Sequence, residues 1–161
     1  MAADYSQLEL RLLAHLSQDS RLLQLLNADR DVFTMIASEW KRKNASDVTP
    51  VERQQAKSIC YGMIYGIGPK TLADQLGVDE REAGAFVKSF QSSYPTVTSF
   101  IKAAVQDCRR LGYVSTIGGR RRFLPDITSS NSFKRSRSER QAVNTRVQGS
   151  ASDLVKMAMI N

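Results

Sequence analysis

Apolar side chains recur at intervals of three or four along most of the chain, and this spacing predicts a helix-rich fold. Near the N-terminus the pattern covers Leu8–Ser17, where leucines form one stripe. Two longer patterns, 79–94 and Pro95–Leu111, meet at a proline that cannot continue the first helix. The same spacing predicts two further helices, one over Pro69–Leu76 with Gly77 as its C-cap and one over 133–161 with an interruption near Gly149.

Two stretches have the pattern of β-strands. Residues 113–117 alternate, Gly118 and Gly119 offer a turn, and 120–124 can return as an antiparallel partner. Residues 2–5 read as the end of another short strand. We therefore expect a helix-rich α+β fold with a small antiparallel sheet.

The most informative stretch is 49–66, TPVERQQAKSICYGMIYG. Thr49 and Glu52 have the spacing of a capping box, in which each side chain satisfies a backbone N–H of the other. Pro50 then falls at the first helical position, where its fixed φ helps and its missing N–H costs nothing. A helix is therefore predicted to begin at Pro50.

On this helix, Arg53, Lys57, Tyr61 and Tyr65 follow one another at intervals of four. Each step of four drifts by about 40° around the helix and rises roughly 6 Å, so the four side chains form one stripe. Two cations followed by two aromatic rings suit a ligand with phosphates at one end and a flat base at the other. An ordinary amphipathic surface helix, with extended cations and half-buried tyrosines, fits the same periodicity.

The basic residues are concentrated in one part of the chain. The net charge is +7. Residues 109–146 hold 10 basic and 2 acidic side chains, whereas residues 1–108 hold 12 basic and 13 acidic ones. Such a block indicates a polyanionic partner, for which nucleic acid is the usual candidate, although a solvated basic face is the plainer alternative.

Composition excludes several classes of protein. Hydrophobic residues make up 42% and charged residues 24%, as is ordinary for a soluble globular protein. No apolar run approaches the roughly 18 residues of a membrane span, and the N-terminus does not resemble a signal peptide. Cys60 and Cys108 are expected to be reduced, buried thiols. We therefore expect an intracellular protein, neither secreted nor bound to a membrane.

Two carboxylates near the N-terminus are candidates for a metal site. In DYSQLELR, Asp4 ends the expected strand and Glu9 lies at the start of the next helix, so both could face one cleft. Carboxylate oxygens are natural ligands for a hard divalent cation. The spacing alone is weak evidence for such a site.

Four motifs in order, DYSQLELR, RQQAKSICYGMIYG, GGRRRFLP and ERQAVNTRVQGSASDLVKMAM, resemble the palm and fingers of family A DNA polymerases. The resemblance covers essentially all 161 residues. Within the family, SEWK and DVF, in which Phe33 stands where bacterial members carry histidine, resemble most the eukaryotic theta-type repair polymerases.

The resemblance implies template-dependent addition of deoxynucleotides to a primer 3′ end, with two Mg²⁺ ions as cofactors. Asp4 and the backbone carbonyl of Tyr5 match metal ligands, and Asp4 is one of two metal-binding aspartates in the family. The residues that match the family's nucleotide-binding positions are Tyr5, Gln7, Glu9, Arg53, Lys57 and Tyr61. Among them, Arg53 and Lys57 would hold the triphosphate and act in catalysis, Tyr61 would stack on the nucleotide, and Glu9 would exclude a 2′-hydroxyl.

The remaining matches concern primer–template DNA. Tyr65 matches the residue at the template stacking site, and Gly62 and Gly66 are interpreted as leaving room for a base beside the backbone. Arg140, Asn144 and Gln148 match family positions that touch the duplex near its terminal base pair. They share a helix face with Arg137. Asp153 matches a helix residue outside the metal site and is not expected to bind metal.

The resemblance also divides the chain. Residues 1–45 and 112–161 would lie on the palm side and residues 46–111 would form the fingers of a right-hand polymerase. The thumb and the second metal-binding aspartate would lie outside the chain, so the fragment alone is expected to be inactive and to hold DNA poorly.

Other readings stay open. They are a non-catalytic nucleic-acid-binding module, or a different family A polymerase such as bacterial polymerase I or the nu type. A theta-like protein would act in the nucleus and a bacterial one in the cytoplasm, and the sequence leaves the oligomeric state unknown.

Overall fold

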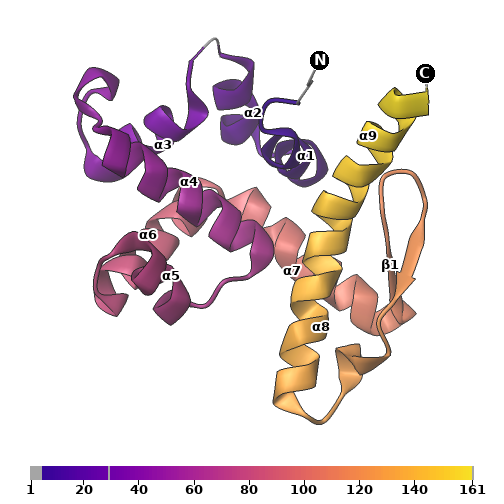
Figure 1. Cartoon of the computed structure of the whole chain (residues 1–161). Helices are drawn as coiled ribbons and strands as arrows, with labels where there is room; N and C mark the ends of the chain where they lie inside the picture. The colour runs from indigo at the N-terminus through magenta and orange to yellow at the C-terminus, as the bar shows by residue number, and fades with distance from the viewer. Residues whose placement is uncertain (1–4, 29, 161) are drawn as a thin grey trace. The chain divides into compact units, whose positions relative to one another are not determined.

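The structure is a computed structural model that describes residues 5–28 and 30–160. Figure 1 shows its helices and a β-hairpin, of which β1 is labelled. In chain order the α-helices and strands are α1 (Leu8–Ser17), α2 (Ser20–Asn27), α3 (Val32–Lys41), α4 (Pro50–Tyr65), α5 (Pro69–Leu76), α6 (Glu80–Ser93), α7 (Pro95–Leu111), β1 (Tyr113–Ser115), β2 (Arg121–Phe123), α8 (Ser132–Asn144) and α9 (Ser150–Ile160). The 3₁₀ turns Ala45–Asp47 and Pro125–Thr128 and the π-helical segment Thr145–Gly149 complete the order.

Local capping sets where the helices begin. The side chains of Asp19, Asp31, Thr49, Asp79 and Asn131 each accept a backbone N–H from the first turn of the helix that follows. Such a bond satisfies one of the otherwise unpaired donors of a helix N-terminus. The predicted starts of α4, α6 and α8 therefore agree with the structure to within a residue.

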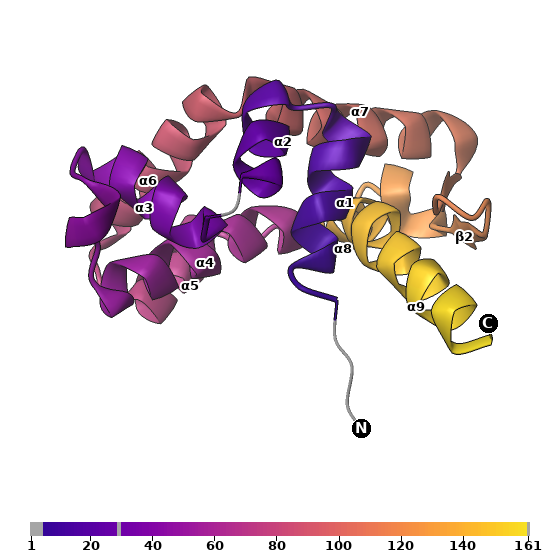
Figure 2. The same cartoon turned by 90° about the horizontal axis from the view of Figure 1, so that it is seen from above.

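The chain divides into two compact units, Gln18–Val97 and a second that combines Met1–Ser17 with Thr98–Asn161. In the first unit, Figure 2 shows α3, α4, α5 and α6 grouped together. Their core consists of Ile59, Leu72, Leu76 and Phe86, with Trp40 packed at its edge. The predicted palm side (1–45 and 112–161) and fingers (46–111) have other borders than these two units. The division into palm and fingers stays a prediction.

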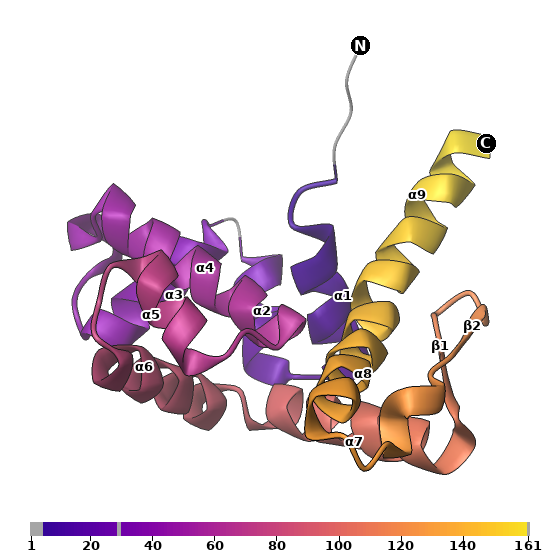
Figure 3. The same cartoon turned by 60° about the horizontal axis from the view of Figure 1, so that its bottom comes forward.

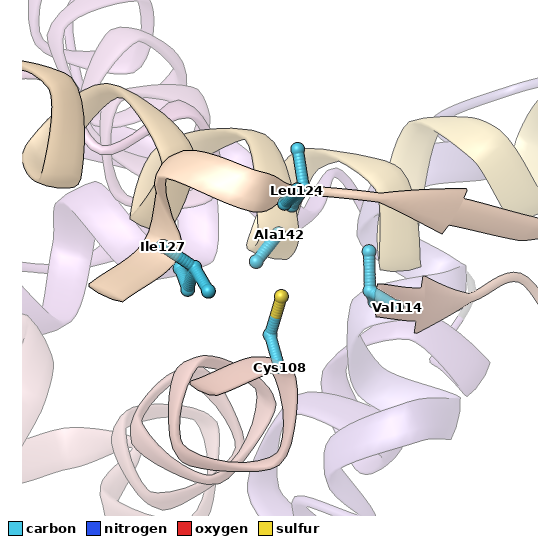
Figure 4. Close-up of a cluster of buried hydrophobic side chains, with 5 residues drawn as sticks. All are labelled: Cys108, Val114, Leu124, Ile127 and Ala142. Atoms are coloured by element: carbon cyan, nitrogen blue, oxygen red, sulfur yellow. The ribbon is translucent and has the colours of Figure 1, made fainter. Parts of the chain in front are cut away.

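The second unit has a separate core. Cys108 of α7, Val114 of β1 and Ala142 of α8 meet Leu124 and Ile127 from the connecting turn (Figure 4). Helix α1 contacts α9 and the π-helical segment, and β1 also contacts that segment. The hairpin is therefore held against the α8–α9 run, beside which it is seen in Figure 3.

The expected hairpin is present, with shorter strands than the pattern indicated. Tyr113 pairs with Phe123, Val114 with Arg122 and Ser115 with Arg121, in antiparallel register. The expected strand at 2–5 lies outside the described residues except for Tyr5, which belongs to no strand. The helix-rich α+β class with a small antiparallel sheet is confirmed.

The predicted interruption near Gly149 is a π-helical segment. The Thr145 hydroxyl donates to the Gln141 carbonyl at 2.7 Å, and the Ser150 hydroxyl donates to the Arg146 carbonyl at 2.5 Å. Such bonds from Ser and Thr to the preceding turn disturb the helix ladder. Gly149 is needed there because an added Cβ would lie 2.7 Å from the Thr116 methyl group.

No helix among the described residues is both long and apolar enough to cross a lipid bilayer.

Candidate nucleotide and nucleic-acid site

The stripe on α4 is formed as the spacing predicts. The helix begins with the full capping box, because Thr49 accepts from the Glu52 N–H and Glu52 accepts from the Thr49 N–H at 2.8 Å. Along it, Arg53, Lys57, Tyr61 and Tyr65 are all partly exposed, while the opposite side buries Ile59 in the core. A ligand can therefore reach the whole stripe.

Arg53 is held by a residue that the sequence reasoning did not select. Its Nε and Nη2 donate to the two carboxylate oxygens of Asp31 at 3.0 and 2.7 Å. Its guanidinium also lies over the Phe33 ring, 5.6 Å from the centroid. Asp31 caps α3 as well, accepting from the N–H and the hydroxyl of Thr34 at 2.8 and 2.9 Å.

The pairing shifts the pKa of both side chains. Burial raises the pKa of Asp31, but the hydrogen bonds from Arg53 and Thr34 outweigh burial and leave that pKa below its usual value. The hydrogen bond to Asp31 raises the pKa of Arg53. Sequence could show Asp31 only as a helix cap, because Arg53 lies 22 residues further along the chain.

Lys57 is the available cation of the stripe. Among the described residues it has no carboxylate partner within ion-pair distance, whereas Arg53 has Asp31. It lies one helical turn from Arg53 on one side and one turn from Tyr61 on the other. An anionic group beside α4 would therefore meet the Lys57 ammonium without displacing a carboxylate.

The aromatic part of the stripe is also organised. The Tyr61 and Tyr65 rings lie 5.9 Å apart and nearly parallel, at 23°. Tyr61 leans on Phe33, with centroids 6.1 Å apart. Phe33 is buried, so it fixes the Tyr61 ring from the core side, and Tyr61 itself is partly exposed.

The two glycines of this helix have structural reasons of their own. A Cβ on Gly62 would lie 3.3 Å from the Leu72 side chain, so Gly62 allows α5 to pack against α4. Its interpretation as room for a base is therefore wrong, because buried side chains fill that space. Gly66 ends α4 in the left-handed conformation at φ 64°, which glycine adopts at no steric cost. Its role toward DNA stays a prediction.

The N-terminal candidates are only partly described. Asp4 lies outside the described residues, and Tyr5 is 53% exposed. Gln7 has a positive φ of 55° and its carbonyl accepts the Arg11 N–H, which starts α1. Glu9 lies in the first turn of α1 and is partly exposed. Among residues 5–28 and 30–160, no three His, Cys, Asp or Glu side chains gather as metal ligands would.

The predicted duplex-binding residues line the end of α8 and the π-helical segment. Arg137 is exposed, and Arg140 is partly buried with its guanidinium donating to the Ser136 hydroxyl at 2.9 Å. Asn144 ends α8, and Gln148 is exposed within Thr145–Gly149. A regular helical face therefore extends through Asn144, and the wider π turn sets where Gln148 points.

Asp153 has a structural partner. Arg120 donates to Asp153 Oδ1 through Nε at 3.0 Å and through Nη2 at 2.8 Å. Hydrogen bonds from Thr116 and from Arg120 lower the pKa of Asp153. This pairing joins the hairpin turn to α9. The expectation that Asp153 does not bind metal stays a prediction.

The structure thus gathers the predicted residues into two groups. Unit Gln18–Val97 holds the α4 stripe together with Asp31 and Phe33. The other unit holds Tyr5, Gln7 and Glu9 of the N-terminal region, and the residues of α8 and its π-helical extension.

Comparisons with known proteins match the whole chain. A sequence model of the family described as DNA polymerase family A matches residues 1–161. DNA polymerase theta of Mus musculus is 52% identical over 161 residues, which are 100% of this chain and 6% of that protein. DNA polymerase I of Bacillus caldotenax is 44% identical over 160 residues, which are 99% of this chain and 18% of that protein.

A solved structure agrees in fold. It is the POL domain of Pol1 from M. smegmatis in complex with DNA primer-template and dNTP, with a TM-score of 0.92 and 39% sequence identity. The match covers 98% of this chain and 28% of that one. The expected resemblance, including the one to theta-type members, is confirmed, and the chain belongs to DNA polymerase family A.

Proposed function

We propose that this chain carries the nucleotide-binding helix and part of the duplex-binding surface of a DNA-directed DNA polymerase. The observation that carries the proposal is the α4 stripe, with Arg53, Lys57 and Tyr61 in order on a helix whose start is fixed by a capping box. Support comes from the solved relative, which is a complex with DNA primer-template and dNTP.

Each group of the stripe has a distinct role in this proposal. Lys57 and Arg53 bind the triphosphate, and their positive charge offsets the charge that develops during phosphoryl transfer. Tyr61 stacks on the nucleotide over the support of Phe33, and Tyr65 occupies the template stacking position. The role proposed for Glu9 is to exclude a 2′-hydroxyl.

The duplex is the second partner. Arg140, Asn144 and Gln148 contact primer–template DNA near its terminal pair. Asn and Gln can donate to minor-groove acceptors that every base pair presents, so they sense pair geometry without sequence preference. Arginines of the basic block add a phosphate term that does not depend on sequence.

Magnesium would be held by Asp4 and the Tyr5 carbonyl. When bound in pairs, such ions activate the primer hydroxyl and stabilise the leaving oxygens. Because Asp4 lies outside the described residues, the fit of this site to magnesium stays a prediction. A role in nuclear DNA repair is also a proposal, and it is based on the similarity to DNA polymerase theta.

The test is binding of a fluorescent deoxynucleoside triphosphate to the chain and to Lys57→Ala. Lys88→Ala is the matched control, because Lys88 is an exposed lysine on α6 of the same unit. We expect Lys57→Ala to weaken binding about tenfold or more and Lys88→Ala to leave it unchanged, since a charge-assisted contact to phosphate contributes about 1.5–3 kcal/mol. Equal affinities of all three proteins would overturn the nucleotide site and favour a non-catalytic nucleic-acid-binding module, which the basic block alone would satisfy.

A further inference from the structure

The β-hairpin has two chemically different faces. Side chains alternate along a strand, and residues paired across an antiparallel ladder lie on the same face. Val114 and its partner Arg122 therefore share one face, and the pairs Tyr113–Phe123 and Ser115–Arg121 share the other.

The Val114 face is turned toward the unit's core. Val114 is 5% exposed and belongs to the cluster with Cys108 and Ala142 (Figure 4). Arg122 from the same face donates to the Thr145 hydroxyl at 3.3 Å. The alternation then places Tyr113, Ser115, Arg121 and Phe123 on the outer face.

This outer face combines aromatic rings with a cation. The Tyr113 and Phe123 rings lie 5.6 Å apart at 56°, and the Arg121 guanidinium lies 4.8 Å from the Tyr113 centroid. Phe123 is 70% exposed, which is unusual for a phenylalanine that has a ring partner. Among the described residues no carboxylate pairs with Arg121, although Arg109, Arg110 and Arg120 of the same basic block each have one.

We propose that this outer face binds single-stranded nucleic acid, with a base stacked on Phe123 and a phosphate at Arg121. Single strands are held by exposed aromatic rings that stack on bases, combined with cations that follow the backbone. A duplex keeps its bases stacked inside, so it cannot use Phe123 in this way. The proposal goes beyond the proposed function, since it includes neither the α4 stripe nor the duplex-binding residues of α8.

The charge of the surroundings favours a polyanion over a protein surface. Residues 109–146 carry 10 basic and 2 acidic side chains, and the hairpin lies within this range. One of the two acidic residues, Glu139, is already paired with Arg109. An apolar protein partner would bury Arg121 without a counter-charge, which is costly.

The test measures fluorescence anisotropy of a labelled oligothymidylate of about 16 nucleotides, within the site sizes known for single-strand binders. An oligomer of equal length without bases is the second probe. Phe123→Ala is compared with Phe133→Ala, because Phe133 is 72% exposed and lies in the same basic block but on α8. Phe123→Tyr keeps a stacking ring and checks that any loss comes from the ring itself.

We expect Phe123→Ala to lower affinity for the oligothymidylate about fivefold or more, which is the lower end for one stacked base, and to leave the base-free oligomer unaffected. Phe133→Ala and Phe123→Tyr should stay within about twofold of the parent chain. An equal loss for both phenylalanines, an equal loss for both probes, or no binding of oligothymidylate would overturn the proposal. Full retention of oligothymidylate binding in Phe123→Ala would likewise overturn it.

The role of Arg121 is tested by salt. Arg121→Gln should flatten the dependence of log affinity on log salt by about 0.7, as expected for one phosphate of a single strand. Lys102→Gln removes the same charge from an exposed position on α7 and should leave the slope unchanged. Equal slopes for the two variants would show that Arg121 does not contact a phosphate of the single strand.

Discussion

At the scale of single residues, the ion pair between Asp31 and Arg53 is the contact that matters most for the proposed nucleotide site. The sequence predicts a cation free to hold phosphate at position 53, and the structure shows a guanidinium already bound through two hydrogen bonds. Both side chains are more than a third exposed, so the pair is screened by water. A triphosphate beside α4 therefore competes with, or shares, the Asp31 counter-charge.

We predict that Asp31→Asn strengthens binding of a deoxynucleoside triphosphate by about two- to fivefold, in line with exposed ion pairs of up to about 1 kcal/mol. Asparagine still caps α3, so the fold should be kept. Asp79→Asn, at the equivalent cap of α6, is the control and should change nothing. Weaker binding by Asp31→Asn would contradict competition and would make Asp31 a residue that positions Arg53.

At the scale of elements, the start of α4 depends on charge as well as on backbone hydrogen bonds. Glu52 accepts from Lys43 at 2.5 Å and from the Thr49 N–H at 2.8 Å. The hydrogen bond from Lys43, followed by those from Thr49, lowers the pKa of Glu52 from 4.5 to about 2. The capping box is thus tied to the connection that precedes the helix.

This lowered pKa predicts a pH window. A carboxyl group whose folded pKa lies below its unfolded value stabilises the fold above the unfolded pKa, and the contribution disappears as pH falls through the folded one. The difference in melting temperature between the parent chain and Glu52→Gln should therefore be largest above about pH 4.5 and shrink toward pH 2. Glu80→Gln, in the first turn of α6, is the charge-matched control. A difference that is constant across this range would contradict the assigned pKa.

The π-helical segment gives a second prediction at this scale. Gly149→Ala should destabilise the chain by about 1–3 kcal/mol, because the new methyl group would lie 2.7 Å from Thr116. Gly84→Ala on α6 meets no atom within 4 Å and should stabilise by about 0.4–1 kcal/mol. Urea unfolding measures both changes. If Gly149→Ala leaves the free energy of unfolding unchanged, the hairpin can move away from this segment without cost.

At the scale of the whole molecule, net charge overstates the number of cations available to DNA. Of the 10 basic side chains in residues 109–146, Arg109, Arg110 and Arg120 are engaged by carboxylates. An arginine that is already paired with a carboxylate gains less binding free energy from a phosphate. The slope of log duplex affinity against log salt should therefore reflect the cations without a carboxylate partner rather than all 10 basic side chains.

We predict that Arg137→Gln flattens the slope of log duplex affinity against log salt by about 0.9, as for one phosphate contact. Arg110→Gln removes the same charge but should alter the slope by less than half as much, because Arg110 is paired with Asp107 at 3.0 Å. Binding of a labelled duplex at several salt concentrations measures both. Equal changes would show that net charge alone governs binding.

Much of the architecture follows from local chemistry and could be predicted from sequence. The N-caps Thr49 and Asp79, the helix start at Pro95, the C-cap at Gly77 and the hairpin turn at Gly118 each depend on residues within a few positions of one another. The α4 stripe is equally local, because helical geometry alone puts residues four apart on one side. The family was visible for the same reason, since its motifs are continuous stretches of sequence.

Tertiary structure decided what those residues touch. Asp31 and Arg53 are 22 positions apart, and the packing of Gly62 against Leu72 depends on how α5 folds back on α4. The outer face of the hairpin is set by Val114, which enters the core from the opposite face. Alternation predicts that two faces exist, but which face meets water depends on hydrophobic contacts with distant helices, and these form only in the folded chain.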